Sequence, residues 1–249
     1  MDKKRLNILI AGGTSGIGRE LCKIYLLKGC KVAITGRRKK LLEEIKISAP
    51  DKVFTYRSDI TELNNSALIN QVGKDIGGID IIIICSGRGN LNPQLLADIE
   101  TQTVKTNVLG FTDFAGAAYL YLAERFKQTG KIGTLAGISS IASFRGSDYA
   151  PAYYASKAYV SNYLEGLRKK AAKEKTGVKI CTVIPGYVDT VLAENVGGKS
   201  LFWVAPIDKA AKQIYKAVAQ DRKTVYITKR WRLIAWILKF VPDFIYYKV

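Results

Sequence analysis

The sequence contains no histidine at all. That absence excludes Ser-His-Asp hydrolysis, Cys-His catalysis and histidine-ligated metal sites, because each of them depends on an imidazole. Cysteine is scarce, and Cys22, Cys30, Cys85 and Cys181 are scattered without a CxxC spacing. We interpret these four residues as small buried hydrophobic side chains in a reducing compartment. We therefore predict no metal site and a cytoplasmic protein whose acid–base chemistry comes from Tyr, Lys, Asp, Glu or Cys.

Acidic residues are few, so the net charge is +18. The basic residues are nevertheless spread along the chain, without an RNA-binding signature or a long Lys/Arg tail, and we expect no nucleic-acid partner. The first ten residues faintly resemble a signal peptide. Their apolar run is too short for one and leads directly into a glycine-rich loop, so a first strand is the better interpretation.

Short apolar runs alternate with amphipathic stretches along almost the whole chain. The predicted strands are Leu6–Ala11, Lys31–Thr35, Lys52–Tyr56, Ile79–Ile84, Lys131–Ala136, Lys179–Ile184 and Thr224–Thr228. The predicted helices are Gly16–Lys28, Lys39–Ser48, Asn64–Lys74, Glu100–Gln128, Ala155–Lys175 and Ile207–Gln220. This alternation predicts an α/β fold with a mostly parallel, seven-stranded sheet covered by helices on both faces. We expect a single domain over residues 1–228, followed by a tail over residues 229–249.

The loop Gly12-Gly-Thr-Ser-Gly-Ile-Gly18 connects the first strand to the first helix. Glycines let a backbone turn tightly and approach a pyrophosphate, which the free N–H groups of the helix start stabilise. A tight turn without a ligand is the alternative. The second strand ends in Gly36-Arg37-Arg38, where NAD-binding folds place a carboxylate on the ribose 2′-OH. Guanidinium groups bind a 2′-phosphate instead, which favours NADP(H) over NAD(H), unless both arginines merely solvate a helix start.

A phenol and an ammonium stand four residues apart at Tyr153 and Lys157. On a helix these positions share a face, so both side chains can enter one pocket. A free tyrosine has a pKa of about 10, and a neighbouring cation lowers it toward neutral pH. The pair is a candidate proton donor. Taken singly, Tyr153 also reads as a packed aromatic ring and Lys157 as a solvated helix residue.

Five motifs occur in a fixed order: the glycine-rich loop, Asn107, Ser140, the Tyr153/Lys157 pair and the segment Pro185-Gly-Tyr-Val-Asp-Thr190. Together they resemble the short-chain dehydrogenase/reductase family over about residues 6 to 226. The resemblance implies a Rossmann-type doubly wound fold and hydride transfer with a nicotinamide cofactor. It also implies a homodimer or homotetramer, assembled through the helices around Glu100–Gln128 and Ala155–Lys175.

By the same resemblance Tyr153 is the catalytic acid, and Lys157 lowers its pKa and binds the nicotinamide ribose. Ser140 orients the carbonyl, and Asn107 holds a water that leads to Lys157. Tyr154 and Ser139 are the neighbouring competitors, and the spacings to Lys157 and between the serine and the tyrosine favour Tyr153 and Ser140. The cofactor contacts that the family implies are Gly12, Thr14, Ser15, Gly16, Ile17, Gly18, Arg37, Arg38, Asp59, Ile60, Gly87, Lys157, Pro185, Gly186, Val188 and Thr190.

The chain departs from the family pattern in two places. Ala11 replaces a threonine before the loop, and Ile84-Cys-Ser-Gly87 replaces Asn-Asn-Ala-Gly after the fourth strand. The second change puts the contact of this segment with the adenosine ribose in question.

After Thr228 the composition becomes basic, apolar and rich in aromatic residues. On a helix Arg232 and Lys239 fall together, and a wide apolar face is covered by Leu233, Ile234, Trp236, Ile237, Phe240 and Val241. This face either lies on a membrane surface or packs against the body or a second subunit. The aromatic content of residues 191–206 indicates an apolar substrate or a lid. The sequence thus predicts an NADP(H)-dependent reductase of an apolar or lipid-like ketone or aldehyde, with peripheral contact at the inner membrane surface if the tail binds lipid. A nucleotide-sensing or scaffold protein that has kept the fold but lost turnover is the alternative.

Overall fold

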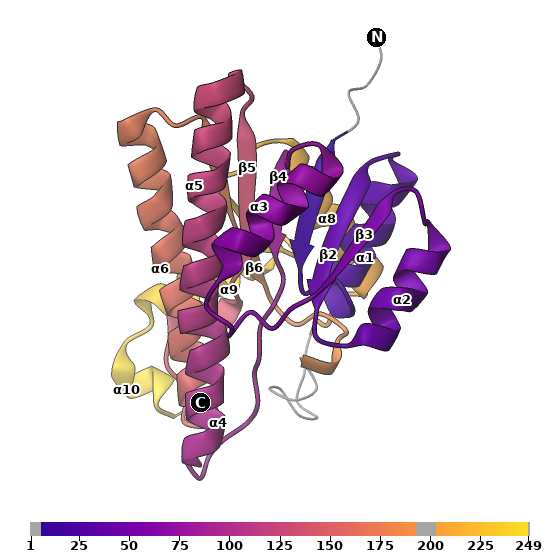
Figure 1. Ribbon diagram of the computed structural model, residues 1–249. Coiled ribbons are helices and arrows are strands. Elements are labelled where there is room, and N and C mark those ends of the chain that lie inside the picture. Colours follow the sequence, from indigo (N-terminus) through magenta and orange to yellow (C-terminus); the bar gives the residue numbers. More distant parts are fainter. Residues whose placement is uncertain (1–5, 193–202, 249) are drawn as a thin grey trace.

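The computed structural model describes residues 6–192 and 203–248 of the chain. Within these residues the strands form one seven-stranded sheet with the order β3-β2-β1-β4-β5-β6-β7, and neighbouring strands pair in parallel (Figure 1). The strands are β1 (Asn7–Ala11), β2 (Lys31–Gly36), β3 (Val53–Arg57), β4 (Ile81–Ile84), β5 (Gly133–Ile138), β6 (Val178–Pro185) and β7 (Thr224–Ile227). The predicted parallel sheet is confirmed.

Helices cover both faces of the sheet. One face packs against α1 (Gly16–Leu27), α2 (Lys39–Ser48) and α8 (Ile207–Ala219). The other packs against α3 (Asn65–Ile76), α5 (Phe111–Thr129) and α6 (Pro151–Glu174). Shorter helical segments are α4 (Ala97–Val104), the π-helix η1 (Lys105–Gly110), the 3-10 turn η2 (Ile141–Phe144), α9 (Trp231–Phe240) and α10 (Asp243–Tyr246).

The central strands are apolar on both sides, which is why they read as continuous hydrophobic runs. In β4 the side chains of Ile81 and Ile83 join the core under α1, whereas Ile82 and Ile84 join the core under α5 and α6. Alternate residues of a strand point to opposite faces, so a strand that is covered twice needs apolar residues throughout.

The observed bounds differ from the predicted ones most clearly in two helices. The predicted helix Glu100–Gln128 starts at Ala97 and is interrupted by η1. The helix predicted from Ala155 begins at Pro151 instead, because proline suits the first helical position, where its missing N–H costs no hydrogen bond. This earlier start places Tyr153 inside α6.

The tail continues the chain as α9 and α10 (Figure 1), and α9 contacts η2. Arg145 forms an ion pair with Asp243, and its guanidinium lies 4.4 Å from the centre of the Tyr246 ring. Across the described parts of the chain, no helix combines the length and the apolar character that crossing a membrane requires.

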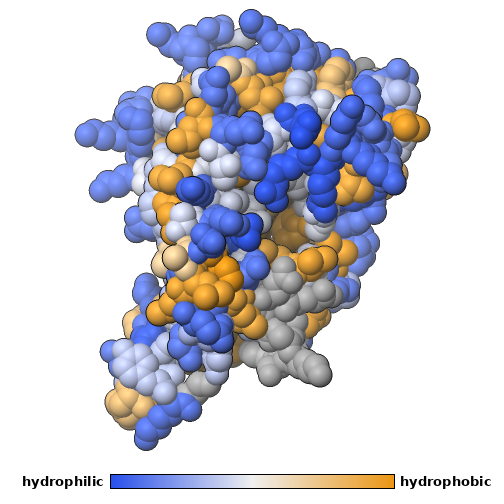
Figure 2. Space-filling model, turned by 60° about the horizontal axis from the view of Figure 1, so that its bottom comes forward, coloured by the Kyte–Doolittle hydropathy of each residue, from blue (hydrophilic) through white to orange (hydrophobic). Residues whose placement is uncertain are grey.

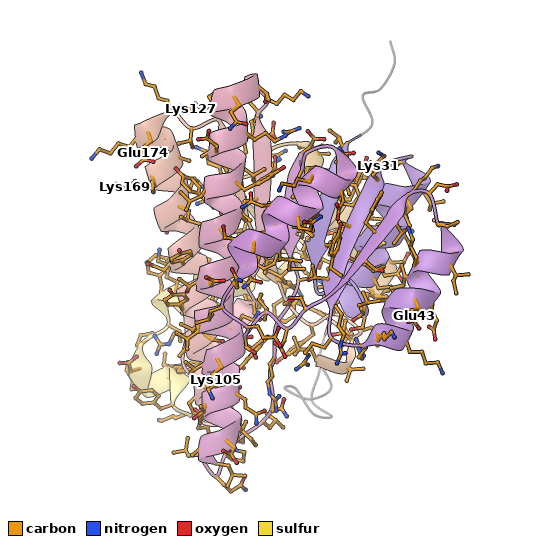
Figure 3. All side chains as sticks on the ribbon, in the orientation of Figure 1. Lys31, Glu43, Lys105, Lys127, Lys169 and Glu174 are labelled. Carbon is orange, nitrogen blue, oxygen red and sulfur yellow. The ribbon has the colours of Figure 1, made fainter. Side chains whose placement is uncertain are left out.

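Exposed basic side chains occur on several elements of the described chain. Figure 3 shows Lys31, Lys105, Lys127 and Lys169 on four different elements, and all four side chains are exposed. Several surface charges are used in local pairs, such as Lys170 with Glu174 and Lys212 with Asp208.

Two buried thiols make the fold sensitive to alkali. Burial raises the pKa of Cys22 and of Cys181 from 9.0 to about 12. Above pH 9 the unfolded chain loses these protons while the folded chain keeps them, so the free energy of unfolding falls as pH rises. We expect each thiol to contribute about 1.4 kcal/mol per pH unit between pH 9 and 12.

Urea unfolding at a series of pH values measures this slope. The Cys181→Ala variant is expected to show a slope that is flatter by about 1.4 kcal/mol per pH unit, whatever its stability at neutral pH. Identical slopes in the variant and the wild type would contradict the assignment.

Candidate active site

A cavity of about 490 Å³ opens where the six strands β1 to β6 end. Ligands of open α/β sheets bind at this carboxyl edge. The residues that line it follow each strand in turn, and they include every site residue predicted from the sequence except Asn107. Motifs that are far apart in the chain therefore meet in one place.

The glycine-rich loop has the shape of a pyrophosphate cradle. Gly12 has φ +80°, and a Cβ at this position would lie 2.7 Å from the backbone nitrogen of Ser86. Helix α1 begins at Gly16 with no acidic residue in its first turn, so its free N–H groups favour an anion. Ile84 is buried in the core. Of the residues that depart from the family pattern, Ile84 therefore lies beneath the cavity wall, whereas Cys85 and Ser86 line the cavity and Ser86 closely approaches Gly12.

The two arginines after β2 have different partners. The guanidinium of Arg38 donates to the hydroxyls of Thr14 at 2.9 Å and of Ser15 at 2.7 Å, which brings it over the glycine-rich loop. Arg37 lies 3.5 Å from the carboxylate of Asp59. Burial alone would raise the pKa of Asp59, but hydrogen bonds from Thr61 and the charge of Arg37 lower it overall. Both arginines were predicted to bind the 2′-phosphate of NADP(H). Because Arg37 is paired with Asp59, this prediction now depends mainly on Arg38.

Tyr153 and Ser140 meet at the other end of the cavity. Tyr153 is buried in the first turn of α6, and its phenol hydrogen-bonds with the Ser140 side chain. The Ser140 hydroxyl also accepts the backbone N–H of Ala142 at 3.2 Å, which fixes it at the start of η2. The competing residue Ser139 is used elsewhere, because its hydroxyl donates to the backbone carbonyl of Lys157 at 2.9 Å.

Lys157 is buried beside this pair. Its ammonium donates to the carbonyl of Ile138 at 3.1 Å and lies 5.7 Å from the centre of the Tyr153 ring. Burial lowers the pKa of Lys157 from 10.5 to about 8, which leaves the side chain mainly charged at neutral pH.

The predicted lowering of the tyrosine pKa was wrong for this arrangement. Burial raises the pKa of Tyr153 to about 12, and the group that opposes this effect is the Ser140 hydroxyl. Desolvation of the phenolate is the largest effect because Tyr153 is almost completely enclosed, and the Lys157 ammonium, 5.7 Å from the ring centre, is not among the groups that shift this pKa. The phenol therefore holds its proton at neutral pH.

Asn107 lies behind the cavity wall, in the π-helix η1. Its side-chain amide donates to the carbonyl of Arg88 at 2.7 Å and to the hydroxyl of Ser156 at 2.9 Å. Its oxygen accepts the N–H of Arg88 at 2.8 Å. Asn107 thus fixes the segment that follows Gly87. Gly87 itself lies close to Lys157, since a Cβ on Gly87 would be 3.4 Å from the ammonium nitrogen. A role in holding a water for Lys157 stays a prediction.

Several lining residues were missed by the sequence reasoning as site residues. Ile141, Tyr154, Tyr187 and Leu192 form an apolar and aromatic wall near Tyr153. Cys85 also lines the cavity, and burial raises the pKa of its thiol to about 12 although the charge of Lys157 lowers it. Tyr187 stands inside the Pro185–Thr190 motif, so the motif itself was the available signal.

Helix α9 of the tail contacts the Pro185–Thr190 segment that lines the cavity. The indole of Trp231, the first residue of α9, lies so close to Gly186 that a Cβ there would be 1.9 Å from the ring. The rings of Tyr187 and Trp231 meet edge to face at 5.5 Å. No spacing rule connects these residues, and only the folded chain brings them together.

Comparison with known proteins gives a consistent result. A family model described as short chain dehydrogenase matches residues 6–200. An uncharacterized oxidoreductase of Staphylococcus aureus is 29% identical over 83% of this chain and 88% of its own length. Another from Myxococcus xanthus is 30% identical over 74% of this chain and 72% of its own.

Solved structures agree at the level of the fold. A short chain dehydrogenase from Burkholderia cenocepacia in complex with NADP superposes with a TM-score of 0.81, covering 100% of this chain and 98% of that one at 20% identity. A short-chain dehydrogenase from Sphingobium yanoikuyae in complex with NADPH gives 0.78, covering 92% and 91% at 21% identity.

Proposed function

Because this chain belongs to the short-chain dehydrogenase family, we propose that it is an NADP(H)-dependent oxidoreductase that reduces a ketone or aldehyde to the alcohol. The observation that carries this proposal is the meeting of Tyr153, Ser140 and Lys157 in the same cavity as the glycine-rich loop and Arg38. When bound, the dihydronicotinamide supplies the hydride that the carbonyl carbon accepts.

The side chains of this chain manage the remaining proton and the orientation of the substrate. The Ser140 hydroxyl hydrogen-bonds the carbonyl oxygen, and Tyr153 transfers its phenolic proton to that oxygen as negative charge develops there. Lys157 holds a positive charge beside the resulting phenolate and hydrogen-bonds the nicotinamide ribose. The backbone N–H groups at Gly16 and beyond bind the pyrophosphate, and Arg38 binds the 2′-phosphate.

The protonation states of Tyr153 and Lys157 suit the proton transfer that carbonyl reduction requires. With a pKa of about 12, Tyr153 is protonated at neutral pH and ready to donate, whereas alcohol oxidation needs a phenolate as the base. The charged Lys157 supports the same step, because it stabilises the phenolate that donation leaves behind.

The wall near Tyr153 supports an apolar or lipid-like substrate. Ile141, Tyr154, Tyr187 and Leu192 bring apolar and aromatic surface to the catalytic end, while the charged residues Arg37, Arg38 and Asp59 lie at the nucleotide end. The family resemblance further favours a homo-oligomer through α5 and α6, where Leu120 is 64% exposed.

The test is oxidation of NADPH by the purified protein with a panel of carbonyl compounds. Decanal and acetophenone represent apolar substrates, and pyruvate and glyoxylate represent small charged ones. We expect turnover with the apolar set and little with the charged set. NADPH binding without turnover of any carbonyl would favour the alternative of a nucleotide-sensing or scaffold protein.

A further inference from the structure

We propose that α9 and α10 dock this protein onto the surface of a membrane that contains anionic lipids. The two helices present a continuous set of exposed apolar side chains, which we call the docking face. Each of these side chains is between 44 and 68% exposed, and the set comprises Leu233, Trp236, Ile237, Phe240, Phe244 and Ile245. Exposed apolar patches of this kind mark sites of interaction, because a folded protein otherwise hides such side chains from water.

The docking face belongs to a firmly attached structure. Trp231 and Ala235 are both 2% exposed, so the opposite side of α9 is packed against the body. Arg145 holds α10 through the ion pair with Asp243 and a hydrogen bond to the carbonyl of Val241 at 3.3 Å. The outward side chains are therefore presented by helices that are fixed on their inner side.

The charges around the docking face select an anionic lipid surface. Residues 229–248 contain the five basic residues Lys229, Arg230, Arg232, Lys239 and Lys248, and one acidic residue, Asp243, which is paired with Arg145. A basic helix with apolar and aromatic residues on one side lies in the headgroup region of a bilayer. A second copy of this chain would instead bring the same excess of positive charge against itself across a two-fold interface.

The docking face lies at the functional end of the molecule. The strands end at the edge that holds the cavity, and α9 is joined to that edge by the contact of Trp231 with Gly186. Figure 2 looks toward this end, and a cluster of hydrophobic side chains lies in the lower half of the view. Docking would bring the cavity toward the headgroups, where an apolar carbonyl compound is concentrated. The inference about docking holds whether or not the proposed reaction is correct.

Flotation of the full-length protein with vesicles tests the proposal. We expect binding to vesicles of phosphatidylcholine mixed with phosphatidylglycerol, and weak binding to phosphatidylcholine alone or at high salt. The double variant Trp236→Ser/Phe240→Ser is expected to lose at least about tenfold in vesicle affinity. The matched control is Leu27→Ser/Ile47→Ser, which changes two exposed apolar residues of α1 and α2 and should bind as the wild type does.

Light scattering, which reports the size of the assembly, and NADPH binding, which reports that the protein is folded, are measured on the same samples. If the serine variant does not fold, Arg232→Gln/Lys239→Gln replaces two exposed cations and should reduce binding to the anionic vesicles alone. Absence of wild-type binding, or equal losses in the variant and the control, would overturn the proposal. If the wild type does not bind vesicles and the Trp236→Ser/Phe240→Ser variant forms smaller assemblies than the wild type, the docking face binds a second copy of the chain and the proposal is wrong.

Discussion

Replacement of Tyr153 by phenylalanine is expected to lower kcat/KM for carbonyl reduction by about 10²–10⁴-fold, the usual contribution of a positioned general acid. The change removes one hydroxyl, and with it the proton that the carbonyl oxygen receives and the hydrogen bond to Ser140. The ring keeps its buried place in α6. NADPH affinity should therefore stay within about twofold, since no phosphate contact is lost.

Tyr154→Phe is the matched control. Tyr154 is adjacent to Tyr153, lines the same cavity and is only partly buried, yet it has no contact with Ser140 among those that the structure gives. Phenylalanine keeps the aromatic ring that Tyr154 contributes to the cavity wall, so we expect kcat/KM to stay within a few-fold of the wild-type value. Stopped-flow NADPH oxidation under single-turnover conditions separates the chemical step from product release. Similar losses in the two variants would reject Tyr153 as the proton donor.

Much of the fold and part of the site could be predicted from the sequence. The predicted strands all occur within two residues of their limits, because doubly covered strands are apolar throughout and leave a clear pattern. The order of the motifs also predicted that Ser140 and Tyr153 share one cavity, because each motif follows a strand and the strands end at the same edge of the sheet. Local pattern and chain topology together were enough for this part of the site.

Properties that depend on burial could not be predicted in the same way. The pKa of Tyr153 is set by how completely the folded chain encloses the phenol, and the i,i+4 spacing to Lys157 carries no information on enclosure. The π-helix at Lys105–Gly110 interrupts an ordinary helical pattern, where Asn107 bonds to the segment after Gly87. Trp231 reaches Gly186 only because β7 returns the chain to the edge of the sheet beside β6.

The division of work between Arg37 and Arg38 leads to the second large effect. Arg38→Glu is expected to lower the affinity for NADPH at least about 100-fold and to leave the affinity for NADH within a few-fold. A hydrogen bond to a charged group contributes about 1.5–3 kcal/mol, and a carboxylate at this position also repels the 2′-phosphate. The guanidinium of Arg38 already donates hydrogen bonds to Thr14 and Ser15, which belong to the glycine-rich loop. The measurement is titration of each nucleotide by nicotinamide fluorescence.

Lys39→Glu separates a specific contact from the general field of a basic protein. Lys39 is the next residue, carries the same charge, is exposed and pairs with Glu43 at 3.7 Å, and it does not line the cavity. Its reversal makes the same change in net charge as Arg38→Glu, so salt-screened attraction of the nucleotide weakens equally in both variants. If the contact of Arg38 with the 2′-phosphate decides the preference, NADPH affinity falls steeply in Arg38→Glu alone. Equal losses in both variants would mean that the preference for NADPH arises from the overall charge of the chain rather than from this guanidinium.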